Sequence, residues 1–212
     1  MGRRGGKRYA GRKKVKREQQ ISFHILCEGQ NTEPIYFNSF PVSNVAHCKG
    51  YARSSLALVE RAIRYKREQG ITKKTKDEVW VVFDYDYNGE LQPKQSQDFN
   101  NSIEKAISNN IKVAISNDSF ELWYVLHFES CNAQEGRNWY NDRLTLRLNF
   151  KYDKERAIAK RMYDLTIDNQ SLAIQRAQAL MEEYDVNDKT HAKKNPYTTV
   201  HLLVQELNKY IK

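Results

Sequence analysis

Two acidic motifs follow directly after apolar segments of the sequence. Glu28, with Gly29 behind it, comes after ISFHILC, and Asp84 and Asp86 come after the run VWVVF. If that run is a strand, the two-residue spacing points both aspartate carboxylates to the same side of the sheet. Like charges at such a separation repel each other unless a cation lies between them. The pattern predicts a metal site; the alternatives are an ordinary turn at Glu28 and a solvated strand end at the aspartates.

Carboxylate oxygens are the ligands available to such a site. Cys27, Cys48 and Cys131 form no CxxC motif, and the five histidines show no HxxxH or Cys/His ligand spacing. Neither a disulfide framework nor a zinc site is therefore indicated, and we expect buried, reduced thiols. Oxygen ligands alone select Mg²⁺ or Mn²⁺ over zinc. Because no P-loop motif is present, we do not expect the chain to hydrolyse ATP itself.

The positive charge of the chain is concentrated at its beginning. Residues 1–17 hold nine of the 35 basic residues and no acid, which leaves 26 basic against 26 acidic residues elsewhere. A segment so poor in apolar residues is expected to be disordered when free. Binding of nucleic-acid phosphates is its predicted use, with a solubilising tail or a patch for anionic lipid as alternatives. The predicted contacts are Arg3, Arg4, Lys7, Arg8, Arg12, Lys13, Lys14, Lys16 and Arg17.

The length of 212 residues suits one compact domain, predicted over 19–212, preceded by a basic arm over 1–18. No stretch of the sequence approaches the roughly 20 apolar residues of a membrane helix. The first residues lack the apolar core of a secretory signal, so we expect a cytoplasmic protein.

Strand and helix alternate in the segments that would hold the acidic motifs. Strands are predicted in ISFHILC, VWVVF and IKVAISND; helices are predicted within 31–40, with Pro34 in the first turn, and over 54–68 and 96–109. Such alternation predicts an α/β fold with a mostly parallel sheet flanked by helices. Ligands of these folds collect outside the carboxyl ends of the strands, where both acidic motifs fall.

The second half of the chain is predicted to be mainly helical. FELWYVLHF is apolar all round, which favours a helix packed deep in the core and leaves a strand as the alternative; Asp118 or Ser119 can cap it. Helical periodicity returns in 153–165, 171–184 and 198–211, so the C-terminal third is helical. Residues 132–150 carry mixed signals and receive no assignment.

Four segments resemble the RloB-like family in their order along the chain. They are ILCEGQNTEPIYF, FDYD, SNDSFELWYVLHFE and NPYTTVHLLVQEL, and together they span almost everything past the arm. The family is regarded as a Toprim-related domain associated with bacterial restriction and abortive-infection loci. The resemblance therefore implies a Toprim-like fold, phosphodiester chemistry and a role in antiphage defence.

The resemblance also implies which acids form the site. Toprim domains carry Glu-Gly after the first strand and a DxD pair after a later one, which match Glu28 with Gly29 and Asp84 with Asp86. The related OLD-type nucleases have a second metal-site glutamate, which points to Glu33; the alternative is that Glu33 caps the following helix. Glu121 is a further candidate ligand or positioning residue, or else a buried, hydrogen-bonded acid.

The predicted function is a metal-dependent nuclease that holds one or two Mg²⁺ or Mn²⁺ ions on Glu28, Glu33, Asp84 and Asp86. Glu28 could instead act as the general acid or base. A covalent phosphotyrosine step stays open, but the length excludes the strand-passage domains of a topoisomerase. Two alternatives lack catalysis: a nucleic-acid-binding module with a degenerate site, and a subunit directed by an ATPase from the same locus. DNA or RNA, endo- or exonuclease, the trigger and the oligomeric state stay open.

Overall fold

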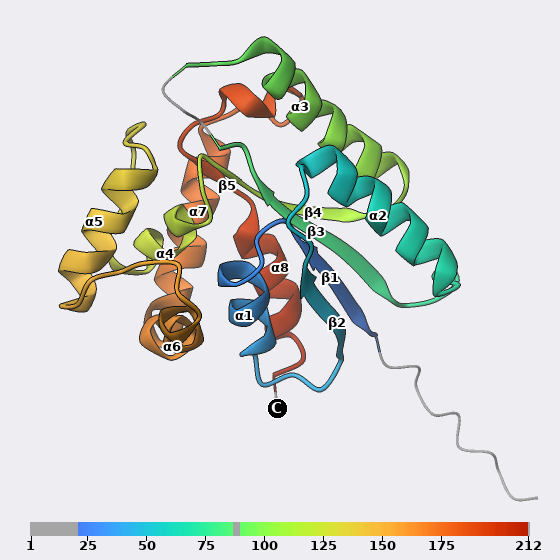
Figure 1. Ribbon diagram of the computed structural model, residues 1–212, viewed down its shortest axis with the longest axis horizontal. Coiled ribbons are helices and arrows are strands. Elements are labelled where there is room, and N and C mark those ends of the chain that lie inside the picture. The colour runs from blue at the N-terminus through green and yellow to red at the C-terminus, as the bar shows by residue number, and fades with distance from the viewer. Residues whose placement is uncertain (1–20, 87–89, 212) are drawn as a thin grey trace, which may run out of the picture.

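The computed structural model describes residues 21–86 and 90–211, and its centre is a single five-stranded sheet (Figure 1). The strand order is β2-β1-β3-β4-β5; neighbours from β2 to β4 run parallel, and β5 is antiparallel to β4. This confirms the predicted mostly parallel α/β sheet. The strands are β1 (Phe23–Cys27), β2 (Val45–Gly50), β3 (Glu78–Asp84), β4 (Lys112–Asn117) and β5 (Tyr197–Thr198).

Helices cover both faces of the sheet. One face is covered by α2 (Ser55–Glu68) and α3 (Pro93–Ser108), which also pack on each other. The other face carries α1 (Thr32–Asn38), α4 (Glu121–Phe128) and α8 (Val200–Asn208). Outside this layer lie α5 (Arg137–Leu148), α6 (Arg156–Thr166), α7 (Gln170–Glu182) and the 3₁₀ turn η1 (Ile167–Asn169). A second 3₁₀ turn, η2 (His191–Lys193), packs against α3 on the first face. The helical C-terminal third is thus confirmed, apart from the short β5.

The alternation of side chains along the strands divides the core into two halves. Ile25 and Cys27 of β1 face the α1, α4 and α8 side, whereas Leu26 faces α2 and α3. Because these strands are covered on both faces, all five residues of β1 are buried. The central strands of the sheet are therefore held between two apolar layers, whereas the edge strand β2 is partly exposed.

Helix α4 lies deep in the core, as its all-round apolar pattern predicted. Seven of its eight residues are buried, so the strand alternative for this segment is wrong. Trp123 is fully buried and its indole N–H donates to the Tyr36 hydroxyl at 3.0 Å, which satisfies the polar atom that its burial would otherwise leave unpaired. Neither Asp118 nor Ser119 caps the helix, because the N-cap position is Phe120 and no side-chain cap bond forms.

Three elements were not predicted from the sequence. Helix α5 lies in the unassigned 132–150 stretch and buries only Tyr140 and Leu144, so its apolar periodicity is weak. Strand β2 is at the sheet edge and no residue of it is fully buried, whereas β5 has only two residues. Elements that bury little apolar surface leave little pattern in the sequence.

The predicted basic arm, with its nine candidate nucleic-acid contacts, lies outside the described residues, as do residues 87–89. Among the helices that the structure describes, none is long and apolar enough to cross a membrane.

Candidate active site

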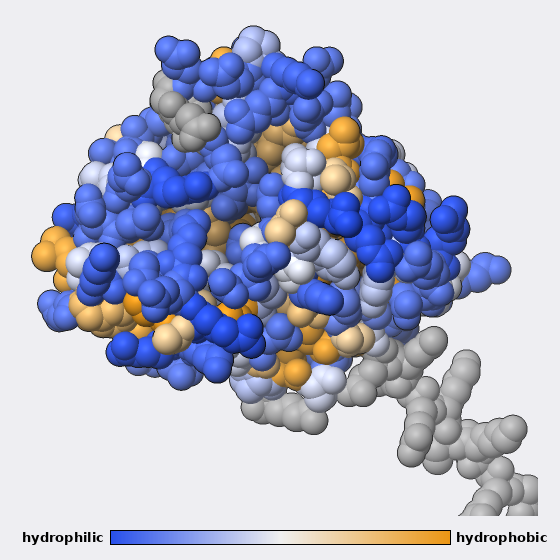
Figure 2. Space-filling view, viewed as in Figure 1, coloured by the Kyte–Doolittle hydropathy of each residue, from blue (hydrophilic) through white to orange (hydrophobic). Residues whose placement is uncertain are grey.

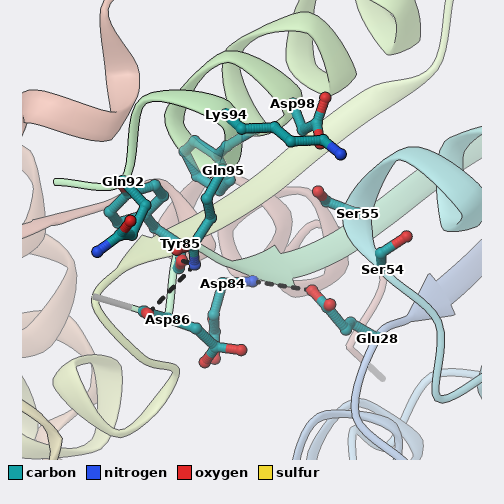
Figure 3. A pocket seen from close by; sticks show the side chains of 11 residues that line it. Glu28, Ser54, Ser55, Asp84, Tyr85, Asp86, Gln92, Lys94, Gln95 and Asp98 are labelled. Carbon is teal, nitrogen blue, oxygen red and sulfur yellow. Dashed lines mark hydrogen bonds between the residues drawn. The ribbon is translucent and has the colours of Figure 1, made fainter. Parts of the chain in front are cut away.

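The carboxyl ends of β1 and β3 bring Glu28 and Asp84 together. These strands are parallel neighbours, with Cys27 opposite Val82, and the Glu28 N–H extends the ladder to the Val82 carbonyl at 2.8 Å. The Glu28 Oε2 atom accepts a hydrogen bond from the Asp84 N–H at 3.4 Å (Figure 3). Two motifs 56 residues apart in sequence therefore share one edge of the sheet.

Asp84 is a carboxylate in an environment that disfavours its charge. Its Oδ2 atom accepts the Phe120 N–H at 2.9 Å, at the start of α4, whereas its Oδ1 atom is buried without a hydrogen-bond partner. Burial and the neighbouring Glu33 raise its pKa well above the ordinary value. An orphaned buried oxygen of this kind is a natural ligand for a cation.

Glu33 lies in the first turn of α1 and folds back over Gly29. Its side chain is 6% exposed, and a Cβ atom on Gly29 would lie 2.2 Å from Glu33 Oε2. A side chain at position 29 would therefore displace this carboxylate. Burial raises the Glu33 pKa, and the backbone N–H groups of Glu33 and Gly29 act in the opposite direction. The carboxylate thus lies near backbone N–H groups of the turn before α1, although no side-chain cap bond forms at the start of that helix. It also acts electrostatically on Asp84.

Asp86 lies beyond the end of β3, where the alternation of a strand no longer applies. Its backbone has φ of 54° and its side chain is exposed, in contact with solvent and with Arg137 at the start of α5. The side-chain direction inferred from strand geometry therefore holds only up to Asp84. The charge of Asp86 is compensated by the Arg137 guanidinium.

Glu121 is fully buried at the start of α4. Its Oε1 atom accepts a hydrogen bond from the Tyr152 hydroxyl at 3.1 Å and lies 3.0 Å from the Lys154 ammonium group. Its Oε2 atom has no hydrogen-bond partner. Burial lowers the pKa of Lys154, but the nearby carboxylate of Glu121 raises it, and the pKa is raised overall. Lys154 therefore stays charged beside the acids.

Three charged residues of this region were not predicted as site residues. They are Arg137, Lys154 and Asp118, whose carboxyl group is 1% exposed with both oxygens unpartnered. Burial raises the Asp118 pKa, and Arg137 opposes that rise. Arg137 and Lys154 come from a part of the sequence without a motif, so only the folded chain reveals them.

A cleft of about 430 Å³ opens beside Glu28, Asp84 and Asp86. Its far wall is formed by the first turns of α2 and α3, and Gln95 of α3 donates to the Tyr85 carbonyl at 2.7 Å (Figure 3). The other polar side chains that line it are Ser54, Ser55, Gln92, Lys94 and Asp98. The acids are thus open to a solvent-borne ligand on this side.

A family model described as RloB-like protein matches residues 23–207. The chain belongs to the RloB-like family. The match runs from β1 to α8 and contains every acid described above. No curated protein and no solved structure matches the chain.

The acids of this RloB-like chain fit a divalent cation in charge and donor chemistry. They offer only oxygens, one of which is orphaned on Asp84, and burial together with Asp86 raises the pKa of Glu28 to about 8. Within 21–86 and 90–211, however, no three Asp, Glu, His or Cys side chains are grouped closely enough to hold a metal. The donor set is therefore suitable, although the side chains as they stand do not form a complete coordination shell.

Proposed function

We propose that this RloB-like protein is a nuclease that uses Mg²⁺ or Mn²⁺ to hydrolyse phosphodiester bonds in nucleic acid, as part of antiphage defence. The observation that carries the proposal is the buried, unpartnered Oδ1 atom of Asp84, a residue that lines the cleft together with Glu28. A buried carboxylate without a partner is costly, and a divalent cation would remove that cost. Strands and helices alternate along the chain, and Glu28 and Asp84 lie at the ends of neighbouring strands. Both features support a Toprim-type origin of the site.

The residues that would hold the ion are Glu28, Glu33, Asp84 and Asp86. When bound, the ion would lower the pKa of a water molecule and stabilise negative charge on the leaving oxygen. The Phe120 N–H fixes the Asp84 carboxylate through its Oδ2 atom. Before metal binding, Glu28 carries a proton at neutral pH, because its pKa is about 8. As a ligand it would give up that proton; if the other acids hold the ion, Glu28 could instead donate the proton to the leaving oxygen.

The cations next to the acids have a separate use. Arg137 pairs with Asp86, and Lys154 pairs with Glu121. Arg137 can turn towards a phosphate when Asp86 binds a metal instead, whereas Lys154 stays paired with Glu121, which is not among the proposed ligands. A guanidinium suits this exchange because its planar donors match both carboxylate and phosphate. The same two ion pairs would then prevent the empty site from repelling a polyanion.

A second candidate is a nucleic-acid-binding or ATPase-directed subunit without catalysis of its own. The ion pairs of Arg137 and Lys154 already compensate two of the acids, and the described residues contain no complete three-ligand group. Both observations favour a site that no longer needs a metal.

The deciding experiment is incubation of the purified chain with plasmid DNA, single-stranded DNA, tRNA and bulk RNA, each with Mg²⁺, Mn²⁺ or EDTA. The nuclease proposal expects cleavage of at least one substrate with metal, none with EDTA, and loss of cleavage in Asp84→Asn. Glu104→Gln is the matched control, because Glu104 is an exposed acid of α3 that pairs with Lys189 away from the acids of the cleft. Binding of nucleic acid without cleavage under any metal condition would favour the second candidate.

A further inference from the structure

A second groove lies on the other side of the acidic residues, next to the edge strand β2. It has a volume of about 460 Å³ and is formed by the start of α1, the end of β2 and the first residue of α6. The polar side chains that line it are Gln30, Asn31, Asn38, Lys49 and Arg156. Most of the face shown in Figure 2 is hydrophilic, with apolar patches towards its lower edge.

The charge of this groove differs from that of the first cleft. Four acids line the cleft, whereas none of the residues that line the groove is acidic. Lys49 and Arg156 are both exposed, and neither forms an ion pair with any carboxylate in the described part of the chain. Two unpaired cations among side-chain amides suit the oxygens of a phosphate backbone.

Groove and cleft are neighbours along two segments of the chain. Glu28 lines the cleft and Gln30, two residues later, lines the groove; Lys49 lines the groove and Ser54 lines the cleft. The ends of β1 and β2 approach closely, since a Cβ atom on Gly50 would lie 2.1 Å from the Gly29 carbonyl oxygen. A chain-like ligand can therefore pass from one to the other over the acidic residues.

We infer that the groove lined by Lys49 and Arg156 binds the phosphate backbone of the substrate strand next to the bond that is cut. This inference rests on the proposed nuclease function and adds where the uncut part of the strand lies. Phosphates in the groove would position the strand, while the acids in the cleft face the scissile phosphate. Lys94, an exposed lysine on the cleft's far wall, faces the strand on the opposite side of that bond.

The test measures binding separately from cleavage. Full-length wild type and Lys49→Gln/Arg156→Gln are titrated into end-labelled single-stranded DNA and RNA of one sequence, in EDTA, by fluorescence anisotropy over a range of salt concentrations. The variant should bind more weakly. The negative slope of log K against log salt should become shallower by about 1.4, because each lost single-strand contact contributes about 0.7. The basic arm is present in every protein and cancels from the comparison.

The matched control removes the same charge from the opposite end of the sheet. Lys74→Gln/Lys76→Gln alters two exposed lysines in the loop before β3 and should leave the affinity and the salt slope close to wild type. Lys49→Arg/Arg156→Lys should restore binding, and circular dichroism melts should show that all variants fold. Equal weakening by both Gln pairs, or no weakening by Lys49→Gln/Arg156→Gln, overturns the inference. Absence of cleavage by the wild type overturns the nuclease proposal but leaves the binding result standing.

Discussion

Replacing Glu28 with glutamine should change how the stability of the metal-free protein depends on pH. The Glu28 carboxyl has a pKa of about 8 in the folded chain, against an ordinary 4.5, chiefly because burial disfavours its charged form. At about 1.4 kcal/mol for each pH unit, the full difference corresponds to about 5 kcal/mol. Solvent at this half-buried group screens part of that interaction, so we expect about 2–4 kcal/mol.

The sign follows from the protons that each state binds. Between pH 4.5 and about 8 the folded protein keeps the Glu28 proton and the unfolded chain has lost it. The free energy of unfolding therefore falls as pH rises through this window and becomes independent of Glu28 above it. The amide introduced by Glu28→Gln would stay neutral and keep an oxygen that accepts the Asp84 N–H, so the variant should lose less stability over the same window.

The assay is urea unfolding in EDTA at several values between pH 5 and pH 8, followed by the fluorescence of the buried Trp80 and Trp123. The stability of Glu28→Gln relative to wild type should increase by about 2–4 kcal/mol from pH 5 to pH 8. Glu104→Gln, at an exposed position of α3, should keep the wild-type slope. Parallel pH profiles for Glu28→Gln and wild type would refute the reasoning.

Three further predictions concern the metal site and the arm. Asp84→Asn/Asp86→Asn should be no less stable than wild type in EDTA, because a buried charge is removed while only an exposed ion pair is lost. Calorimetric titration should show no Mn²⁺ binding to the double variant. Equal stabilisation of both proteins by Mn²⁺ would contradict the assignment of these aspartates as ligands. Gly29→Ala should cost about 1 kcal/mol in urea unfolding, because the displaced atoms are the flexible end of Glu33, yet should weaken Mn²⁺ binding; unchanged Mn²⁺ affinity would argue against Glu33 as a ligand. Removal of residues 1–17 should leave the melting temperature unchanged and flatten the salt dependence of nucleic-acid binding; an unchanged slope would make the arm a solubility tail.

The elements predicted correctly are those that bury a continuous apolar face. Strand β3 and helix α4 are buried on nearly all sides, so nearly every position had to be apolar. The run in β3 predicted a strand, and that in α4 favoured a buried helix over a strand. Strand β2 and helix α5 lie at the margins and bury few residues. Their positions depend on neighbours supplied by distant segments, and no local pattern records that dependence.

The sequence by itself determined the fold class, the family resemblance and the placing of Glu28 and Asp84 at strand ends, because strand alternation and chain order are local properties. Only the tertiary structure decided the charge balance of the site. Arg137 reaches Asp86 across 51 residues, and Arg156 comes beside Lys49 from a distant segment of the chain. Burial, which sets the pKa values of Glu28 and Asp84, likewise arises only when helices and sheet exclude water together.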